Sequence, residues 1–547
     1  MRNSLVLAFL FLLGLAACNE EFTDPNDPKY DNTEVKGILL HTDQLHQTMH
    51  HFGASDGWAV SVIGKNWPES DKELISKLLF SQDIGEGNQP QGIGLSMWRT
   101  NIGAGSANQS NNGFAADAWF RATECALQPD GTYDWTQQEG SRWFLKKAKE
   151  MGVEYVTGWV TSPPYFMTKN GYTFSTPGTG GFNLDENKYV DFARYLSSFI
   201  AYNESQDITF DYVSPVNEPQ WSWQAEVGTA AQEGSSATNQ EISDLVEKIN
   251  LIFALDQIQT KIILPEAGDL EFLHSRDGSN PPTSDQVKAF WDPSSSSYVG
   301  DDTSVDRLVA GHSYWSNSSI ATGIENRVKL RSRLDSYDVD FWQTEYSILG
   351  GDYLEGRSEA QLKDIDYALW LTRIMHWDIS IANATGWSFW TSLSYPKWAD
   401  HKFRFGLLNW YPDSENRDNS SGTIEETKNL WAFGNFSRFV RPGYQRIEVE
   451  NNLFSTVELQ AENLMVTGYM SPDHREVVLV FVNYSSKDVD VPITNYAAEG
   501  GVRFTDDIVT TYTTDQTRNL LPKSVSIEDL NIKAKSIITV VGTINQP

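Results

Sequence analysis

The chain has 547 residues, of which 40% are hydrophobic and 21% charged, and its formal net charge at pH 7 is −31. This composition excludes extensive disorder, and the length favours two domains or one large barrel with an accessory domain. The acidic balance repels nucleic acid and other polyanions at long range, so we expect neutral partners and no nucleic acid.

The first residues have the pattern of an export signal. Arg2 is followed by an apolar run, Leu5–Leu13, that is too short to span a bilayer, and by small residues that end at Cys18. The last four, Leu-Ala-Ala-Cys, are similar to the end of a bacterial lipoprotein signal. We therefore expect residues 1–17 to be a lipoprotein signal peptide and Cys18 to carry the lipid. A plain signal peptide with a chance cysteine is the alternative.

The segment that follows differs from the rest of the chain. Residues 18–35 are acidic, contain prolines and hold few apolar side chains, which predicts a flexible tether. Such acidic residues are similar to the export tags of surface lipoproteins in some Gram-negative bacteria. We expect a protein that is anchored by lipid to the outer membrane or cell surface of such a bacterium and contacts the membrane only there. Cys125 is then the only remaining thiol, so no intramolecular disulfide is expected.

From about residue 48 to 435, short apolar or β-branched runs alternate with breaks and longer helical stretches. This alternation predicts a parallel sheet with crossover helices. There are eight such runs, which is the number of strands in a (β/α)8 TIM barrel. The runs are Phe52–Val62, Gly94–Asn101, Val153–Thr161, Phe210–Val216, Lys261–Pro265, Arg307–Trp315, Asp340–Ile348 and Ala384–Ser392.

Two of the intervening stretches have apolar residues at helical spacing, and we expect both apolar faces to pack against the core. Gly152 follows the first of them and is typical of a helix end. The two faces comprise Phe144, Leu145, Ala148 and Met151, and Val190, Ala193, Leu196 and Ile200.

After about residue 436 the pattern changes to alternating runs rich in β-branched residues, with turn signals between them. Examples are Val477–Val482, Val489–Ile493 and Ser536–Val541. These runs predict that residues 436–547 form an antiparallel β-sandwich.

Glutamates stand at the ends of two predicted barrel strands. Glu218, in Ser-Pro-Val-Asn-Glu-Pro-Gln-Trp, follows the fourth run, and Glu345 ends the seventh. Because the carboxyl ends of barrel strands converge on one face, the two carboxylates are expected to meet there. A separation of roughly 5 to 5.5 Å suits a nucleophile and an acid/base in retaining glycoside hydrolysis, whereas inversion needs about 6.5 to 9.5 Å. Arg99, at the end of the second run, is placed to keep the nucleophile ionised.

Six elements occur in the order in which they occur in glycoside hydrolase family 30, which the chain resembles from about residue 36 onward. The elements are Phe52-Gly-Ala-Ser-Asp-Gly-Trp58, Trp98-Arg-Thr-Asn-Ile-Gly103, Ser162-Pro-Pro164, Pro215-Val-Asn-Glu-Pro219, Thr344-Glu-Tyr346 and Gly434-Asn-Phe-Ser-Arg-Phe-Val-Arg-Pro442. The resemblance implies a clan A barrel at 48–435 and a side β-sandwich built from 436–547 and a strand segment at 36–47.

The resemblance also implies roles for individual residues. Glu218 matches the acid/base of the family, Glu345 matches the nucleophile, and Arg99 matches the partner of the nucleophile. Asn217 is implied to hydrogen-bond the sugar next to its reacting carbon. Trp390 matches the aromatic floor under the cleaved sugar.

Further residues at predicted strand ends are candidates for substrate contacts. Asp56 and Trp58 are expected to hold sugar hydroxyls, with a capped turn as the alternative. His312 and Tyr314 end the sixth run, and we expect Tyr314 to donate to the nucleophile, with ordinary packing as the alternative. Candidates for stacking on sugar faces follow the third and fourth runs: Trp159, Tyr165 and Trp221.

The chain departs from many relatives at two places. His50-His51 stands where many have aspartate or glutamine before the first phenylalanine–glycine, and Tyr165-Phe166 stands where many have tryptophan. We expect both pairs near sugar subsites. Histidines also occur at 41 and 46, but their spacing matches no standard zinc pattern, and a strand leading into the barrel explains them better. We expect no metal and no cofactor.

The sequence thus predicts retaining hydrolysis of β-glycosidic bonds in a polysaccharide, with endo action. It most resembles family members that act on β-1,6-galactan, the side chains of arabinogalactan. The alternatives are β-1,6-glucan and xylan. A non-catalytic surface lipoprotein that captures glycans is an alternative of a different class. We expect a monomer.

Overall fold

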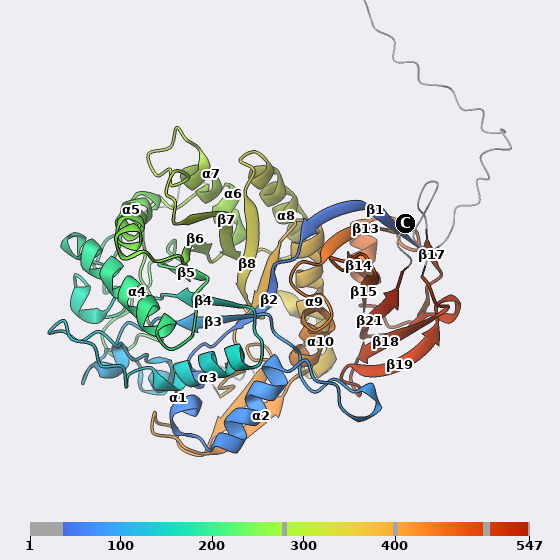
Figure 1. The fold of residues 1–547 in the computed structure, drawn as a ribbon, viewed down its shortest axis with the longest axis horizontal. Helices are drawn as coiled ribbons and strands as arrows, with labels where there is room; N and C mark the ends of the chain where they lie inside the picture. The colour runs from blue at the N-terminus through green and yellow to red at the C-terminus, as the bar shows by residue number, and fades with distance from the viewer. Residues whose placement is uncertain (1–36, 276–281, 398–402, 496–503, 545–547) are drawn as a thin grey trace, which may run out of the picture. The chain divides into compact units, whose positions relative to one another are not determined.

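The computed structural model describes residues 37–275, 282–397, 403–495 and 504–544 (Figure 1). The predicted signal peptide, the lipidation site Cys18 and the acidic tether lie outside the described residues. The chain from Gly37 onward forms one compact unit. Within the described part of the chain, no helix has the length and apolar character needed to cross a membrane.

Eight parallel strands form a closed barrel, which confirms the predicted fold class. Each strand pairs with the next one along the chain, and the last pairs with the first. The strands are β2 (His51–Ser55), β3 (Met97–Asn101), β4 (Tyr155–Trp159), β5 (Tyr212–Ser214), β6 (Lys261–Ala267), β7 (Val305–His312), β8 (Asp340–Tyr346) and β9 (Gly386–Phe389). All eight overlap the predicted runs. The first run was predicted too long, because the strand ends at Ser55 and a helix begins at Ala59.

Helices alternate with these strands and surround the barrel (Figure 1). The capping box of Thr238 and Glu241 starts one of them, since each side chain satisfies an amide that has no partner within the helix. The helices between Ala59 and Ser437 are α1 (Ala59–Asn66), α2 (Glu69–Phe80), α3 (Glu139–Glu150), α4 (Tyr189–Glu204), α5 (Asn239–Asp256), α6 (Leu270–His274), α7 (Gln286–Trp291), α8 (Ile320–Asp335), α9 (Asp364–Ser380) and α10 (Lys428–Ser437).

The two predicted amphipathic stretches are α3 and α4. Gly152, just past the end of α3, has a φ of +86°, a backbone conformation that glycine adopts without steric cost. In α4 one residue was assigned to the wrong face: Val190 is 39% exposed, whereas Ala193, Leu196 and Ile200 are buried. Val190 lies in the first turn, on the solvent side of the helix.

An aromatic cluster fills the end of the barrel where the strands begin. His50 stacks on Tyr155 with ring centroids 4.0 Å apart and hydrogen-bonds the Tyr212 hydroxyl at 3.1 Å. Burial lowers the pKa of His50 to about 4, and burial together with His50 lowers the pKa of His51, so both rings are neutral. The prediction that His50-His51 lies near a sugar subsite is therefore wrong, because strand polarity places these residues at the opposite end from Glu345.

The other two histidines of this region pair with glutamates across neighbouring strands. They lie on β1 (Ile38–Thr48), which pairs antiparallel with β13 (Gln445–Asn451). His41 Nε2 lies 3.3 Å from Glu450 Oε2, and His46 Nε2 lies 2.7 Å from Glu448 Oε2. Cross-strand pairing thus accounts for these side chains.

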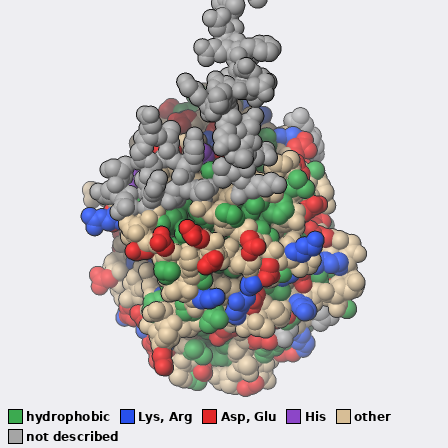
Figure 2. Space-filling view, turned by 90° about the vertical axis from the view of Figure 1, so that its right-hand side faces the viewer, with side chains coloured by type: hydrophobic (Ala, Val, Ile, Leu, Met, Phe, Trp, Pro, Cys, Tyr) green, Lys and Arg blue, Asp and Glu red, His purple; other side chains and the backbone are tan. Residues whose placement is uncertain are grey.

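A second sheet, mostly antiparallel, follows the barrel. It has eight strands in the order β17-β1-β13-β14-β15-β21-β18-β19, so β1 belongs to it although it precedes the barrel. Its remaining strands are β14 (Leu464–Met470), β15 (Glu476–Asn483), β17 (Ile493–Asn495), β18 (Ile508–Thr514), β19 (Leu521–Ser526) and β21 (Ser536–Thr543). On the face of the molecule seen in Figure 2, acidic and basic side chains are interspersed.

Smaller elements complete the fold. A three-stranded sheet follows β9 along the chain, a two-stranded sheet accompanies the large sheet, and one short helix precedes β14. These elements are β10 (Leu393–Ser394), β11 (Leu408–Pro412), β12 (Gly422–Glu426), β16 (Val489–Asp490), β20 (Asn531–Ile532) and α11 (Val457–Glu462).

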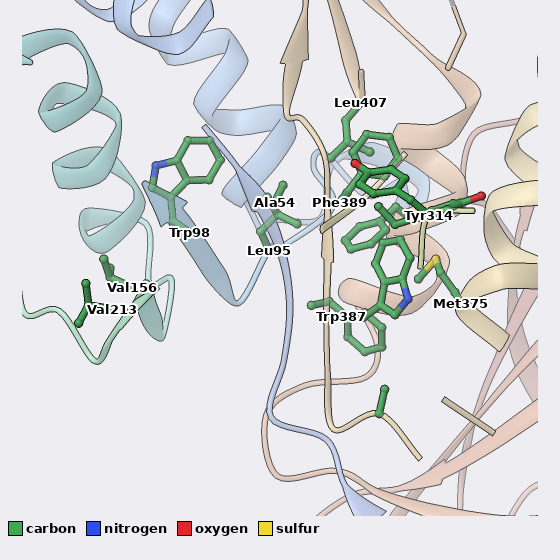
Figure 3. Close-up of a cluster of buried hydrophobic side chains, with 14 of the residues drawn as sticks. Ala54, Leu95, Trp98, Val156, Val213, Tyr314, Met375, Trp387, Phe389 and Leu407 are labelled. Carbon is green, nitrogen blue, oxygen red and sulfur yellow. The ribbon is translucent and has the colours of Figure 1, made fainter. Parts of the chain in front are cut away.

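Strand β15 is buried on both faces, which explains its unbroken apolar sequence. Val478, Val480 and Val482 belong to the same hydrophobic core as the barrel. Their neighbours, Val477, Leu479 and Phe481, belong to a separate core on the other side of the sheet. Helix α10 contacts β2 of the barrel and β18 and β21 of the sheet (Figure 1). Helix α9 contacts β14 and β15 of the sheet, and its Trp370 donates to Tyr346 of β8. Figure 3 shows part of the shared core, including side chains from β9 and α9.

Candidate active site

The ends of the barrel strands enclose a pocket of about 220 Å³, which we call the first pocket. Loop residues that the sequence did not single out complete its wall, among them Phe120, Arg121, Gln232 and Tyr395. Seven of the predicted site residues line it: Trp58, Trp159, Asn217, Glu218, Tyr314, Glu345 and Trp390. The structure therefore brings together residues that are up to 332 positions apart in the chain, from Trp58 to Trp390.

Glu218 and Glu345 face each other across this pocket. Glu218 follows β5 with a φ of +46°, and its amide donates to the Glu266 carbonyl at 2.8 Å. Both side chains belong to buried residues, 8% and 6% exposed. One carboxylate oxygen of Glu218 lies within 4.8 Å of one of Glu345. This short separation fits a retaining pair rather than an inverting pair.

A buried arginine joins Glu345 to Asn217. Arg99 donates from Nη1 to Glu345 Oε2 at 2.9 Å and from Nη2 to Asn217 Oδ1 at 3.1 Å. Its guanidinium lies 4.4 Å from the centre of the Trp159 ring, which excludes water from one side. Burial raises the pKa of Glu345, and the charges of His312 and Arg99 oppose that effect.

Tyr314 adds a second donor to the same carboxylate. Its hydroxyl lies 3.3 Å from Glu345 Oε1. Burial, with the nearby charge of Glu345, raises the pKa of Tyr314 well above its usual value of 10, so the hydroxyl stays protonated and able to donate. Arg99 and Tyr314 thus hold the two oxygens of Glu345 separately.

Behind Glu218 lies an ionic chain that includes a residue the sequence reasoning missed, Glu266. His312 bridges two carboxylates: Nδ1 lies 2.9 Å from Glu218 Oε1, and Nε2 lies 2.9 Å from Glu266 Oε2. Burial opposes the charge on His312, but Glu345, Glu218 and Glu266 outweigh it and raise the pKa of His312 to about 9. The ring is therefore a cation at neutral pH.

Glu266 is fully buried and is the next-to-last residue of β6. Burial by itself disfavours its charge, but Arg99, His312 and Ser214 outweigh burial and lower the pKa of Glu266 to about 2. Thr344 also donates to this carboxylate. Glu266 thus supplies a permanent negative charge that fixes the position of His312. Its signal in the sequence is similar to the one used for Glu218: an acidic residue within two positions of the end of a predicted barrel strand.

Five predicted site residues do not line the first pocket. Arg99 and His312 contact its two glutamates as described above, and the other three are Asp56, Tyr165 and Trp221. Asp56 is fully buried and accepts hydrogen bonds from Thr100 Oγ1 at 2.8 Å and from the amide of Asn101 at 3.1 Å. Burial raises its pKa to about 7. Asp56 thus holds the turn after β2, which is the capped-turn alternative to a contact with sugar hydroxyls. Tyr165 lies in a 3-10 turn and contacts Phe166, whereas Trp221 lines a neighbouring pocket.

Only one set of side chains in the described residues has donor atoms close enough to suit a metal ion: Glu218, His312 and Glu345, within 4.8 Å of one another. The electrostatics of the set do not favour a cation. Both nitrogens of His312 already bond carboxylates, the ring is positively charged, and Arg99 neutralises Glu345. A proton and a guanidinium thus supply the positive charge that a metal would bring.

Two carboxylates that face each other at the carboxyl end of a (β/α)8 barrel are the arrangement that glycoside-cleaving enzymes use. The family model described as O-Glycosyl hydrolase family 30 matches residues 35–402. The chain belongs to glycoside hydrolase family 30, a clan A family of retaining O-glycosyl hydrolases. A carbohydrate is therefore its class of substrate.

Solved structures show the same fold. A conserved exported protein from Bacteroides fragilis is 31% identical, with a TM-score of 0.83, over 92% of this chain and 100% of that one. The catalytic domain of xylanase C from Talaromyces cellulolyticus is 18% identical, with a TM-score of 0.61, over 93% and 100%. An endo-β-1,6-glucanase is 15% identical, also with a TM-score of 0.61, over 92% and 94%. At these lower identities the similarity shows the fold alone.

Gly268 permits polar groups to approach closely beside Glu218. A Cβ at this position would lie 2.6 Å from Gln220 Nε2 and Trp221 Nε1, and 2.7 Å from Glu218 Oε1. We expect Gly268→Ala to displace Glu218 and to lower kcat/KM by about 100-fold, since a shift near 1 Å has an effect of that order.

The matched control for this change is Gly180→Ala, because no atom lies within 4 Å of a Cβ there. Circular dichroism and thermal unfolding of both variants report whether the fold is kept. Equal activity of Gly268→Ala and the unchanged protein would contradict this account of Glu218.

Proposed function

We propose that this protein hydrolyses β-1,6-galactan, of the kind found in arabinogalactan side chains, by an endo-acting retaining mechanism. The observation that carries the proposal is the buried pair Glu218 and Glu345, whose oxygens approach within 4.8 Å and whose surroundings differ. Membership of the family supports the reaction type. The resemblance of the sequence to β-1,6-galactan-degrading members supports the substrate.

The reaction that we propose has two steps. In the first, a Glu345 oxygen attacks the anomeric carbon, the glycosidic C–O bond breaks, and Glu218 donates its proton to the departing oxygen. The product is a covalent glycosyl ester on Glu345. In the second, Glu218 takes a proton from water, the water oxygen attacks the same carbon, and Glu345 leaves as a carboxylate. Two inversions at one carbon give overall retention.

The surrounding residues have separate tasks in this scheme. Arg99 and Tyr314 hold Glu345 and lower the energy of its charged form, which exists before attack and after release. Asn217 accepts the hydrogen bond from Arg99 with Oδ1. Its side-chain nitrogen is left to donate to the hydroxyl next to the reacting carbon. His312 keeps Glu218 in position between the pocket and Glu266.

The test is product analysis after the chain from residue 20 onward is incubated with debranched arabinogalactan, the β-1,6-glucan pustulan and xylan. We expect galacto-oligosaccharides from the first and none with Glu345→Gln. Products from pustulan or xylan alone would assign one of those substrates instead. Release of single galactose units would assign exo action.

The alternative of another class is a glycan-capture protein without turnover. The intact set of Glu218, Glu345, Arg99 and Asn217 argues against it, since binding alone needs no such charge arrangement. Binding to one polysaccharide without any product from the unchanged protein would establish it.

We also propose that the protein is lipid-anchored through Cys18 at the outer membrane or cell surface. The lipoprotein-like sequence before Cys18 supports this, as does the similarity to an exported Bacteroides fragilis protein. Labelling with a radioactive fatty acid is expected in the unchanged protein and absent in Cys18→Ala. Equal labelling of both would contradict the proposal.

The contacts of His312 with Glu218 and Glu266 predict an upper pH limit for the stability and activity of the protein. The pKa of His312 rises from 6.5 to about 9 on folding, so its contribution to stability is complete below pH 6.5 and is lost as pH rises through about 9. We expect thermal stability and kcat/KM to fall together across that range. The pKa of Glu266, about 2, keeps this residue ionised throughout.

The control is His312→Gln, which has no titrating ring. Its melting temperature is expected to be lower near pH 7 and to lack the His312 step near pH 9. If the two proteins lose stability in parallel between pH 8 and 10, another group controls the alkaline limit.

A further inference from the structure

A second pocket adjoins the first at Glu218. Its volume is about 770 Å³, and Glu218, Trp223 and Leu349 line both pockets. If the sugar that bonds to Glu345 occupies the first pocket, the departing sugar must lie near Glu218, which protonates its oxygen. The second pocket begins at that carboxylate and so has the position required for the departing sugar.

The second pocket carries an exposed tryptophan. Trp315 is 53% exposed, although it directly follows the buried Tyr314. Its backbone has a φ of +57°, a left-handed conformation that is uncommon for a residue with a large side chain. The ring lies 3.2 Å from the position that a Cβ would take at Gly350, so glycine leaves room for it there. A flat apolar surface held in a pocket next to Glu218 suits the face of a sugar ring.

The charges of the second pocket are all of one sign. Asp269 and Glu271 line it together with Glu218, and no lysine or arginine occurs among the described residues of its lining. Asp269 is fixed: it accepts from Ser316 Oγ at 2.9 Å and from the Glu271 amide at 3.0 Å. A sugar that carries a carboxylate or sulfate would meet like charges at close range, whereas a neutral sugar would not.

We propose that Trp315 is the stacking platform for the departing sugar and that Asp269 and Glu271 make this subsite select neutral sugars over acidic ones. The inference rests on the proposed function, because it needs Glu218 to protonate the departing oxygen. It adds a specificity that the choice among galactan, glucan and xylan does not contain.

The first experiment compares two substrates of one sugar: a neutral oligosaccharide and the corresponding β-glycosyl fluoride. The fluoride has no departing sugar, so Trp315 cannot contact one. We expect Trp315→Ala to lower kcat/KM about tenfold on the oligosaccharide, as for loss of one central aromatic contact, and to leave the fluoride unchanged. Leu255→Ala is the surface control, since Leu255 is 67% exposed on α5 and lines neither pocket.

The outcomes separate this inference from the proposed function. If the unchanged protein hydrolyses neither substrate, the proposed function fails. If it hydrolyses both, and Trp315→Ala keeps full activity on the oligosaccharide or loses equal activity on both, the platform role is overturned while the function stands.

The second experiment tests charge selection. We expect the unchanged protein at low salt to cleave the neutral oligosaccharide several-fold faster than one with a uronic acid as the departing sugar. Glu271→Gln and added salt should each narrow that difference. Glu247→Gln removes the same charge from the surface of α5 and should not. Equal cleavage of both substrates by the unchanged protein at low salt would overturn the selection.

Discussion

Replacing Glu345 by alanine is expected to lower kcat on glycan by about 10⁴-fold or more, because no other group can form the covalent intermediate. The variant leaves a space below the anomeric carbon where the carboxylate stood. Azide is small enough to occupy it. With an activated β-glycoside and azide we therefore expect renewed turnover and an α-glycosyl azide as product, since one displacement inverts the carbon once.

This result distinguishes the nucleophile from a residue that only shapes the pocket. A β-glycosyl azide, or no rescue from a folded variant, would contradict the assignment. Because Glu345 also anchors Arg99, thermal unfolding of the variant must show that the site has not collapsed. Glu345→Gln keeps the shape of the side chain and removes its charge, so its thermal unfolding is the reference for that of Glu345→Ala.

Glu218→Ala is expected to give the second largest effect, and that effect should depend on the leaving group. On native glycan kcat/KM should fall by about 10² to 10⁴-fold, the usual contribution of a general acid. On a dinitrophenyl β-glycoside kcat/KM should change by less than about tenfold, because that leaving group departs without a proton. The measurement is kcat/KM, since it reports the first step alone.

Azide provides a check on the same variant. It attacks the glycosyl ester on Glu345 without needing a base, so it should raise kcat and give a β-glycosyl azide. The opposite product from that of Glu345→Ala identifies the two roles in one pair of reactions. An equal loss of kcat/KM on glycan and on the dinitrophenyl substrate would contradict the assignment of Glu218 as the acid.

The positions of the catalytic pair could be predicted because they depend on strand polarity. Glu218 and Glu345 each follow or end a β-rich run, and parallel strands send all their carboxyl ends to one face. The same rule points to Glu266, which directly follows the predicted fifth run, Lys261–Pro265. It was missed because no second cue, such as a neighbouring asparagine, marked it.

Where residues depend on loop conformation, the sequence predicted less. Asp56 and Trp58 are two residues apart, yet one is buried against Thr100 while the other lines the pocket. Arg121 comes from a 3-10 turn and reaches the pocket by stacking over Trp58 at 4.6 Å. The spacing of residues along the sequence does not indicate such contacts between loops that are far apart in the chain.

The misplaced His50-His51 has a different cause. His50 and His51 directly precede Phe52-Gly53, which belongs to one of the six family elements, but they do not lie next to the pocket. His50 precedes β2, whereas the first pocket lies at the other end of that strand, beyond Ser55, where Trp58 lines it. Proximity along the chain was thus mistaken for proximity in space.

Strand β15 has a practical consequence for anyone who wishes to shorten this enzyme. Val478, Val480 and Val482 lie in the hydrophobic core of the barrel. Ending the chain after the last barrel helix would therefore remove part of that core and expose a hydrophobic surface to water. The sheet is thus not an independent accessory domain, because its side chains complete the core of the catalytic barrel. Trimmed versions should precipitate, and recombination between relatives should succeed only where both parts are exchanged together.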